Sequence, residues 1–415
     1  MSDLTEADAH IVVVGAGQAG LQAAETLRAG GFEGRVTLVG SEPHAPYHRP
    51  PLSKGWLSEA LDARQLAIRD VSALERKNID LRVASHVAEI DANARAVRLQ
   101  DDSRIAYSGL VLATGATPRM LGNAAPADGT ICALRSREDA SAIAKGLRNC
   151  LQARLPLVVI GGGFIGLEVA ASARKLGADV VVLEAAPRLL QRALSRELSD
   201  WYARLHASHG VTLVLDARID KVETSGSTAQ VRLIDGRRWE AGLVLVGVGI
   251  IPNDELARRA GIACDNGIIV DACSRTSIAG IVAAGDCTVC RLPDGSMRRL
   301  ESVQSAVEQG RAAAYTLLGM EKPFTGTPWF WSDQYDAKLQ IAGLSRSADR
   351  SVARGDMAGK SFSIFHYAVD RLVAVDSINA ARDHVIARQL IGVGVSPTID
   401  QVSDISFDLG RLRPA

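Results

Sequence analysis

The chain has 415 residues, with 47 basic and 47 acidic side chains and therefore no formal net charge. This length exceeds the size at which a single hydrophobic core stops growing, so two or three domains are expected. The charge balance argues against bulk attraction to nucleic acid or to an anionic membrane, and a hydrophobic content of 47% is typical of a soluble globular protein.

Targeting and metal-binding signals are not evident. The first ten residues, MSDLTEADAH, contain acids and no apolar segment, which argues against a secretory signal. The apolar run LVLVGVGIIP is too short and too glycine-rich to span a bilayer. The six cysteines are irregularly spaced and the eight histidines lack metal-ligand spacing, so we expect a cytoplasmic protein without a metal site.

Residues 10–42 predict a strand, a glycine turn, an alanine-rich helix and a second strand, which is a βαβ unit. The turn, GAGQAG, fits the G-x-G-x-x-G fingerprint that places a pyrophosphate at a helix N-terminus. Its residues are Gly15, Ala16, Gly17, Gln18, Ala19 and Gly20. The second strand ends at Gly40-Ser41-Glu42, so Glu42 is the candidate ligand of an adenosine ribose, the alternative being a solvated loop acid.

Residues 107–121 predict a strand followed by a Gly/Pro loop, and residues 239–253 repeat that pattern. Each segment closes a βαβ unit.

Residues 157–185 form the second βαβ unit and repeat the fingerprint as GGGFIG, from Gly161 to Gly166. Glu184 ends its second strand, where a carboxylate accepts hydrogen bonds from a ribose 2′-hydroxyl and repels a 2′-phosphate. This favours NAD over NADP, although Arg188 and Arg192 leave a 2′-phosphate site open.

The buried strand predicted within residues 276–287 is not needed by the second unit, so the chain is expected to return there to the first domain. The predicted fold is α/β, with two Rossmann-like dinucleotide-binding domains in a glutathione-reductase-like arrangement and a C-terminal α+β domain. The predicted boundaries are 1–119 with 247–326 for the FAD domain, 120–246 for the NAD domain and 327–415 for the C-terminal domain.

Two dinucleotide folds in one chain suggest two dinucleotides, one of them a flavin. Hydride transfer between them depends on orientation rather than on acid–base groups, so we expect no catalytic acid or base. Cys287 and Cys290 form a C-x-x-C next to Gly285-Asp286. We interpret them as loop cysteines, with a redox disulfide as the alternative.

Residues 327–336, TPWFWSDQYD, concentrate four aromatic side chains in a chain with 4% aromatic residues. Alternation in an extended segment predicts Trp329 and Trp331 on one side and Phe330 on the other. Residues 361–379 then predict a hairpin with a turn near Asp370, followed by a helix.

These motifs resemble those of the FAD-dependent, NADH-linked ferredoxin reductases of bacterial cytochrome P450 and aromatic-ring dioxygenase systems. The resemblance covers nearly the whole chain and includes GAGQAG, RPPLSK, LATGATPR, LRSREDA, GGGFIGLEVAA, GVGIIPN, AAGDC, ESVQSA and PWFWSDQY. It implies a bacterial cytoplasmic oxidoreductase that passes electrons from NADH through FAD to a [2Fe–2S] ferredoxin serving one of those oxygenases. A monomer is expected, with a dimer left open.

The resemblance also implies site residues. Besides the first fingerprint, the FAD set comprises Ser41, Glu42, Arg49, Lys54, Val87, Ala113, Thr114, Gly115, Arg135, Gly285, Asp286, Val303 and Trp331, with Lys54 and Trp331 near the flavin ring. The NAD set comprises Gly161, Gly163, Phe164, Ile165, Gly166, Glu168, Glu184, Arg192, Gly249 and Glu301. Relatives often carry Asp at the position of Ser41, which leaves open whether Ser41 or Glu42 contacts the FAD ribose.

A ferredoxin is typically acidic, so a basic docking face is expected. Its candidates are Arg311, Lys338, Arg346 and Arg350. The alternatives are a rubredoxin reductase, an NADH oxidase-type flavoprotein, or a flavoprotein that binds NADH and signals through its redox state. Thiol-based variants are disfavoured because no cysteine precedes Cys132.

Overall fold

The computed structural model describes residues 8–122, 129–292 and 295–413. Residues 1–7, 123–128, 293–294 and 414–415 lie outside these ranges. The predicted domain boundaries at residues 1 and 415 are therefore outside the described part of the chain. The described chain divides into two compact units, and each is described by itself. Unit 1 contains residues 1–48, 63–117 and 250–326, and unit 2 contains residues 49–62, 118–249 and 327–415.

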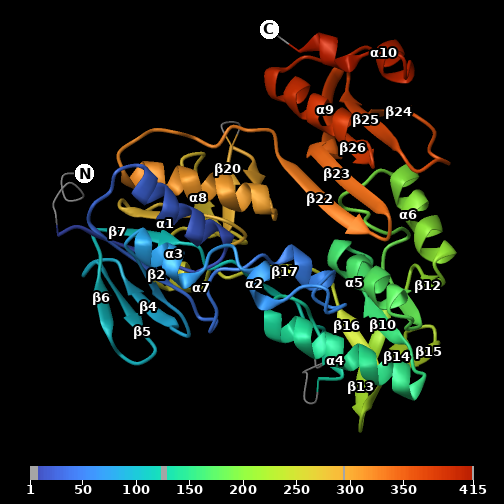
Figure 1. Ribbon diagram of the computed structural model, residues 1–415, viewed down its shortest axis with the longest axis horizontal. Coiled ribbons are helices and arrows are strands. Elements are labelled where there is room, and N and C mark those ends of the chain that lie inside the picture. The colour runs from blue at the N-terminus through green and yellow to red at the C-terminus, as the bar shows by residue number, and fades with distance from the viewer. Residues whose placement is uncertain (1–7, 123–128, 293–294, 414–415) are drawn as a thin grey trace. The chain divides into compact units, whose positions relative to one another are not determined.

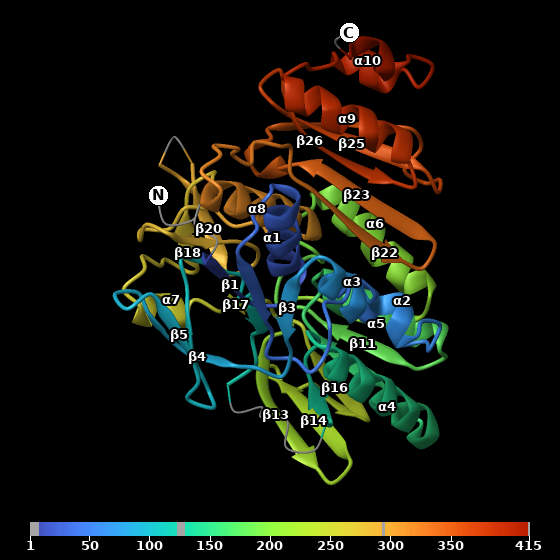
Figure 2. The same ribbon diagram turned by 60° about the vertical axis from the view of Figure 1, so that its left-hand side comes forward.

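Unit 1 is built on a five-stranded parallel sheet with the order β19-β7-β1-β2-β3. These strands span Ile281–Ala283, Gly109–Leu112, His10–Val14, Arg35–Val39 and Ile79–Arg82. Helices α1 (Gln18–Ala29) and α8 (Val303–Leu317) lie side by side and pack against the sheet (Figure 2). The strand at Ile281–Ala283 pairs with β7, so the predicted return of the chain to the first nucleotide fold is confirmed.

Smaller elements complete unit 1. Two three-stranded sheets are β4 (Val87–Asp91), β5 (Ala96–Leu99) and β6 (Arg104–Ala106), and β18 (Ile268–Val270), β20 (Thr288–Arg291) and β21 (Met297–Arg298). Its short helices are α2 (Ala63–Leu66), α3 (Val71–Arg76) and α7 (Glu255–Arg259). The strands β8 (Ala116–Pro118) and β17 (Ile250–Pro252) lie at the sequence positions where the chain passes between the units.

Unit 2 contains the second parallel sheet, in the order β12-β11-β10-β16-β9. These strands span Val211–Val214, Val180–Leu183, Leu157–Ile160, Leu243–Val246 and Ile131–Cys132. Its helices are α4 (Arg137–Ala153), α5 (Phe164–Lys175) and α6 (Arg196–Ser208), and a hairpin sheet adds β13 (Ile219–Ser225), β14 (Thr228–Leu233) and β15 (Arg238–Ala241). Both nucleotide folds are therefore α/β with parallel strands, as predicted.

The C-terminal part of unit 2 is an antiparallel sheet in the order β22-β23-β26-β25-β24. Its strands span Trp329–Gln334, Ala337–Gly343, Arg371–Ile378, Phe362–Ala368 and Arg350–Arg354, and the short helix η3 spans Ser345–Ser347. Helices α9 (Ala381–Val393) and α10 (Ile399–Ser403) and the turn η4 (Leu409–Leu412) follow the sheet, and they pack on Phe365, Tyr367 and Val375 (Figure 1). The predicted hairpin, with its turn at Val369–Asp370, and the predicted helix are confirmed.

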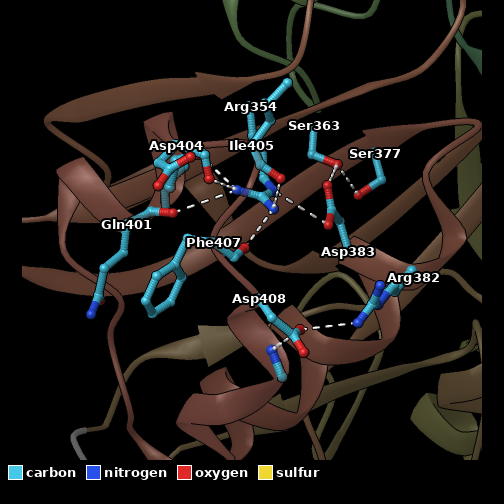
Figure 3. Close-up of polar contacts among 12 residues, drawn as sticks. Arg354, Ser363, Ser377, Arg382, Asp383, Gln401, Asp404, Ile405, Phe407 and Asp408 are labelled. Atoms are coloured by element: carbon cyan, nitrogen blue, oxygen red, sulfur yellow. Dashed lines mark hydrogen bonds and ion pairs between the residues drawn. The ribbon is translucent and has the colours of Figure 1, made fainter.

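Arg354 fastens the chain after α10 to this sheet. Its guanidinium donates to the carbonyl oxygens of Val402, Asp404 and Phe407 at 3.1, 2.7 and 2.9 Å (Figure 3). It also lies 3.5 Å from the carboxylate of Asp383 on α9. A single side chain therefore satisfies carbonyl groups that α10 and the following turn leave without helical partners.

Residues 49–62 group with unit 2 rather than with the predicted FAD domain. They include the short helix η2 (Pro50–Ser53), and the hydroxyl of Ser172 on α5 donates to the carbonyl of Ser53 at 2.7 Å. The second nucleotide fold and the C-terminal sheet also share one compact unit, whereas the sequence predicts separate domains. The three-domain boundaries remain a prediction.

Candidate functional site

The first glycine turn follows β1 and opens α1 as the fingerprint requires. Gly15 has φ +111°, and a Cβ there would lie 2.1 Å from the carbonyl oxygen of Ala113. A Cβ on Gly20 would lie 1.9 Å from the carbonyl oxygen of Gly15, whereas a Cβ on Gly17 would meet nothing within 4 Å. Gly17 is also the N-cap of α1, and no side chain caps that end. Gly15 and Gly20 are thus packed tightly against neighbouring backbone, whereas the backbone at Gly17, at the N-terminus of α1, is open. This arrangement fits a pyrophosphate bound at the helix N-terminus.

A cavity of about 530 Å³ adjoins this turn within unit 1. Four residues of the predicted FAD set line it: Gly15, Ser41, Val87 and Thr114. The structure therefore brings together positions from four separate stretches of sequence. Ala113, Thr114 and Gly115 form the loop between β7 and β8, and Gly115 has φ +68°.

Several residues that line this cavity were not predicted from the sequence, among them His86, Asn253 and Arg259. Asn253 fixes the loop after β7. Its side chain donates to the carbonyl of Thr114 at 2.9 Å and accepts from the hydroxyl of Thr117 at 2.8 Å. The sequence signal for Asn253 is the Pro-Asn pair that ends GVGIIPN, and this pair predicts only a turn, not a residue that lines a cavity.

Ser41 and Glu42 differ in where they lie. Ser41 is exposed and lines the cavity, whereas the carboxylate of Glu42 accepts a hydrogen bond from the hydroxyl of Tyr47. The structure therefore favours Ser41 as the residue nearer to a bound ribose, while the role of either remains a prediction.

The Gly285-Asp286 turn follows β19 in unit 1, and Gln309 holds it. The buried Gln309 side chain accepts from the Gly285 N–H at 2.7 Å and from the Thr288 hydroxyl at 2.9 Å. Asp286 is half-buried, and Val303 begins α8 behind the N-cap Ser302. Gln309 is a further residue that the sequence analysis missed, because a glutamine inside an alanine-rich helix gives no signal.

Cys287 and Cys290 are free thiols. Burial raises the pKa of both thiols. No disulfide joins them. Cys287 lies in the turn after β19, as interpreted, whereas Cys290 lies within β20, so the interpretation as a loop cysteine is wrong for Cys290. Within residues 8–122, 129–292 and 295–413 no group of histidine, cysteine and acidic side chains has the arrangement of a metal site.

In unit 2, the second glycine turn shows the same geometry. Gly161 has φ +107°, and a Cβ on Gly166 would lie 2.5 Å from its carbonyl oxygen. Gly163 is the N-cap of α5, again without a side-chain cap. Phe164 and Ile165 follow in the first turn of the helix, and Ile165 is exposed.

Glu184 lies directly after β11, as predicted, and its carboxylate is held by backbone. One oxygen accepts from the N–H of Gly162 at 2.5 Å and the other from the N–H of Ala186 at 2.7 Å. The carboxylate is therefore fixed beside the second glycine turn. Arg188 instead donates to the carbonyl of Leu194 and the hydroxyl of Ser199, both at 2.7 Å. These intramolecular hydrogen bonds engage its guanidinium, which was one of the two candidate ligands for a 2′-phosphate.

Glu168 on α5 is buried, at 6% exposure, and forms an ion pair of 2.6 Å with Lys54. The hydroxyls of Ser53 and Ser332 also donate to it, at 2.5 and 2.7 Å. Two predicted residues, Lys54 from the FAD set and Glu168 from the NAD set, are thus in direct contact. The two serines were not predicted.

Other predicted residues of unit 2 also meet. Arg49 donates to the carbonyl of Arg135 at 2.6 Å. A Cβ on Gly249 would lie 3.7 Å from the guanidinium of Arg192. Glu301 belongs to unit 1, where it pairs with Arg299 at 2.9 Å.

The aromatic stretch follows the predicted alternation. The rings of Trp329 and Trp331 are 5.4 Å apart on one side of β22, and Phe330 contacts Phe164 of the second glycine turn, with ring centroids 4.6 Å apart. On the Trp329 side, Arg388 of α9 lies 5.5 Å from the indole.

Two nucleotide-binding folds, each with an open glycine turn at a helix N-terminus, define the class as a dinucleotide-dependent oxidoreductase. Comparison with known proteins agrees. The family model for pyridine nucleotide-disulphide oxidoreductases matches residues 9–310, and that for the reductase C-terminal domain matches residues 329–413.

Curated relatives include rhodocoxin reductase of Rhodococcus erythropolis, 42% identical over 96% of this chain and 93% of the relative. Putidaredoxin reductase of Pseudomonas putida is 40% identical over 93% of this chain and 92% of the relative. A solved ferredoxin reductase for the CYP199A2 system of Rhodopseudomonas palustris superimposes with a TM-score of 0.93 and 39% identity, covering 98% of this chain and 100% of that chain.

The chain therefore belongs to the ferredoxin reductases of the pyridine nucleotide-disulphide oxidoreductase family. It is an oxidoreductase that uses FAD and NAD(H), and the predicted fold class and family are confirmed. No helix in the described ranges is long and apolar enough to cross a bilayer.

Proposed function

We propose that the protein transfers electrons from NADH through FAD to a [2Fe–2S] ferredoxin that supplies a cytochrome P450 or a ring-hydroxylating dioxygenase. When bound, FAD supplies the chemistry that accepts a hydride from NADH and passes two electrons on singly. The observation that carries the proposal is the pair of open glycine turns, one in each unit, in a chain so similar to reductases of this kind. A solved complex of putidaredoxin reductase with putidaredoxin is similar to this chain, with a TM-score of 0.93 and 37% identity.

The residues divide the work between the two cofactors. Gly15, Gly17 and the N-terminus of α1 would hold the FAD pyrophosphate, with Ser41 and Val87 at the adenosine side. Gly161, Gly163 and α5 would hold the NADH pyrophosphate, and Glu184 would accept from the ribose hydroxyls. Lys54 and Glu168 would face the reacting rings, with Trp331 near the flavin.

The electron acceptor is proposed to dock on basic side chains. Lys338, Arg346 and Arg350 are exposed and form no ion pair within the described part of the chain. Arg311 pairs with Glu308 at 2.9 Å, which makes it the weakest candidate. Lys338 and Trp331 project from the same face of the C-terminal sheet, because Trp331 pairs with Gln340 and Asp333 with Lys338. Lys338 is therefore the sharpest candidate.

The proposal is tested by NADH-driven reduction of purified [2Fe–2S] ferredoxins at increasing salt. Docking through exposed charges predicts that the rate falls as salt rises, and that Lys338→Glu lowers it several-fold at low salt. Arg238→Glu, at an exposed arginine of the separate β13-β14-β15 sheet, is the matched control and should leave the rate unchanged. A rate independent of salt and of Lys338 would contradict electrostatic docking.

The remaining expectations concern location and assembly. The six cysteines are free thiols, which is typical of a reducing cytoplasm and supports the proposal that the protein works there. A monomer beside its ferredoxin is the proposed assembly.

A further inference from the structure

We propose that Ser332 of the C-terminal sheet is a positioning residue for Glu168, and that Gln334 and His206 orient Ser332 for this task. The inference rests on the proposed function in one respect: Glu168 and Lys54 are taken as the residues that face the reacting rings. All the contacts that carry it lie within unit 2.

The first step is the environment of Glu168. Its carboxylate is buried, so it needs partners on both oxygens to be stable. Lys54 and Ser53, which follow one another in the RPPLSK loop, occupy Oε2. Oε1 accepts from the hydroxyl of Ser332 at 2.7 Å. The carboxylate is thus held between the loop on one side and strand β22 on the other.

A series of hydrogen-bonded side chains leads from Ser332 to α6. The amide nitrogen of Gln334 donates to the Ser332 hydroxyl at 3.1 Å, and the amide oxygen of Gln334 lies 2.7 Å from Nε2 of His206 on α6. Because that oxygen can only accept, Nε2 of His206 must carry the hydrogen. Nδ1 then accepts from the hydroxyl of Tyr335, 3.4 Å away.

The hydrogen bonds of this series all run in one direction. Every donor in the series Tyr335, His206, Gln334 and Ser332 points toward Glu168. Aligned hydrogen bonds of this kind polarise one another in a buried setting. Ser332, Gln334 and His206 are each exposed by no more than 1%, so water does not substitute for a missing member. Burial lowers the pKa of His206 to about 4, which keeps its ring neutral and the direction fixed at neutral pH.

Strand β22, which carries Ser332, is anchored to α5 and α6 by contacts other than the Ser332 hydroxyl. The ring of Tyr335, at the hairpin tip, stacks on His209 with centroids 3.7 Å apart and planes inclined by 14°. Lys175 at the end of α5 donates to the Tyr335 carbonyl at 3.1 Å. The strand is thus attached to α5 and α6 independently of Ser332. Removing the Ser332 hydroxyl should leave the fold intact and free the Glu168 carboxylate to turn away from Lys54.

The experiment compares wild type with Ser332→Ala and with Ser377→Ala, all loaded with FAD. Ser377 is the matched control, since it is equally buried in the same sheet and bonds to Ser363 rather than to Glu168. The readouts are the dissociation constant for NAD⁺ by calorimetry, the rate of flavin reduction by NADH and the melting temperature. We expect Ser332→Ala to slow flavin reduction about tenfold, the size of one hydrogen bond to a charged group.

The control separates positioning from simple destabilisation. Both variants should remain folded, with the larger fall in melting temperature for Ser332→Ala, because that variant leaves Oε1 of the buried Glu168 without its donor. At a temperature well below both melting temperatures, only Ser332→Ala should change the rate of flavin reduction by NADH and the affinity for NAD⁺. Equal rates in both variants would overturn the inference. If NADH failed to reduce the flavin of the wild-type protein, the proposed function itself would fail instead.

A second measurement does not depend on a variant that folds or on activity. The ¹⁵N shifts of His206 in the wild-type protein should show hydrogen on Nε2 and none on Nδ1 at neutral pH. Hydrogen on Nδ1 would break the series of donors and overturn the inference.

Discussion

At the scale of single residues, Glu184 gives the most direct link between geometry and coenzyme choice. Its two oxygens accept from the backbone N–H groups of Gly162 and Ala186, so the carboxylate is fixed beside the second glycine turn, where we propose that the NADH ribose binds. A 2′-phosphate in that place would meet a like charge at short range.

Glu184→Ala should therefore narrow the preference for NADH over NADPH by about tenfold or more, because the repulsion of the 2′-phosphate is removed. The measurement is kcat/KM for both coenzymes with an artificial acceptor. Glu223→Ala, at an exposed acid on β13, is the control. An unchanged ratio would show that Glu184 does not face the ribose.

His206 links burial to the pH dependence of stability. Its pKa in the folded protein is lowered to about 4 by desolvation, whereas the unfolded chain titrates near 6.5. Above pH 6.5 the ring is neutral in both states, and its contribution is fully present. As the pH falls from 6.5 toward 4, the unfolded state binds the proton first, so stability declines by up to about 3 kcal/mol.

His206→Gln should flatten this decline in a urea-denaturation series between pH 7 and pH 4.5. His86→Gln, at an exposed histidine of unit 1, should leave the slope as in wild type. Parallel curves for wild type and His206→Gln would contradict a buried neutral ring.

At the scale of elements, Arg354 on β24 is the clearest stabilising contact of the C-terminal domain. It connects the sheet to carbonyls at the end of α10 and in the turn that follows, and to Asp383 on α9 (Figure 3). Its side chain is 11% exposed and that of Asp383 is 20% exposed, and among the carbonyl partners Val402 is buried whereas Asp404 is exposed.

Arg354→Ala should lower the free energy of unfolding by about 2–4 kcal/mol, because several carbonyl groups and a carboxylate lose their donor. Hydrogen exchange should show the loss first at α10 and η4. Arg350→Ala, an exposed arginine on the same strand, is the control. Normal protection of residues 399–412 in Arg354→Ala would contradict this role.

At the scale of the whole molecule, the sequence predicts the fold better than the site. The two βαβ units, the late strand β19 and the C-terminal hairpin follow from hydrophobic runs and glycine turns, which are local signals. The grouping of residues 49–62 with unit 2 does not follow from local signals. It depends on contacts of Ser53 and Lys54 with Glu168 of α5, more than a hundred residues later in the sequence.

The same reason explains which site residues were missed. Gly15, Gly161 and Glu184 belong to a motif with fixed spacing, and they lie after β1, β10 and β11, respectively, while their contacts with the cofactors stay a prediction. Ser332, Gln309 and Asn253 act through contacts with residues far away in sequence, and serine, glutamine or asparagine alone predicts nothing. Such residues become visible only when the chain is folded.

The central claim is that one chain takes electrons from NADH and delivers them to a ferredoxin. Anaerobic stopped-flow mixing tests it most directly, with the FAD-loaded protein first reduced by one equivalent of NADH and then mixed with an oxidised [2Fe–2S] ferredoxin. NADH should bleach the flavin rapidly, and the flavin should then be reoxidised as the ferredoxin is reduced. A flavin that NADH reduces but that no ferredoxin of this type reoxidises would contradict it.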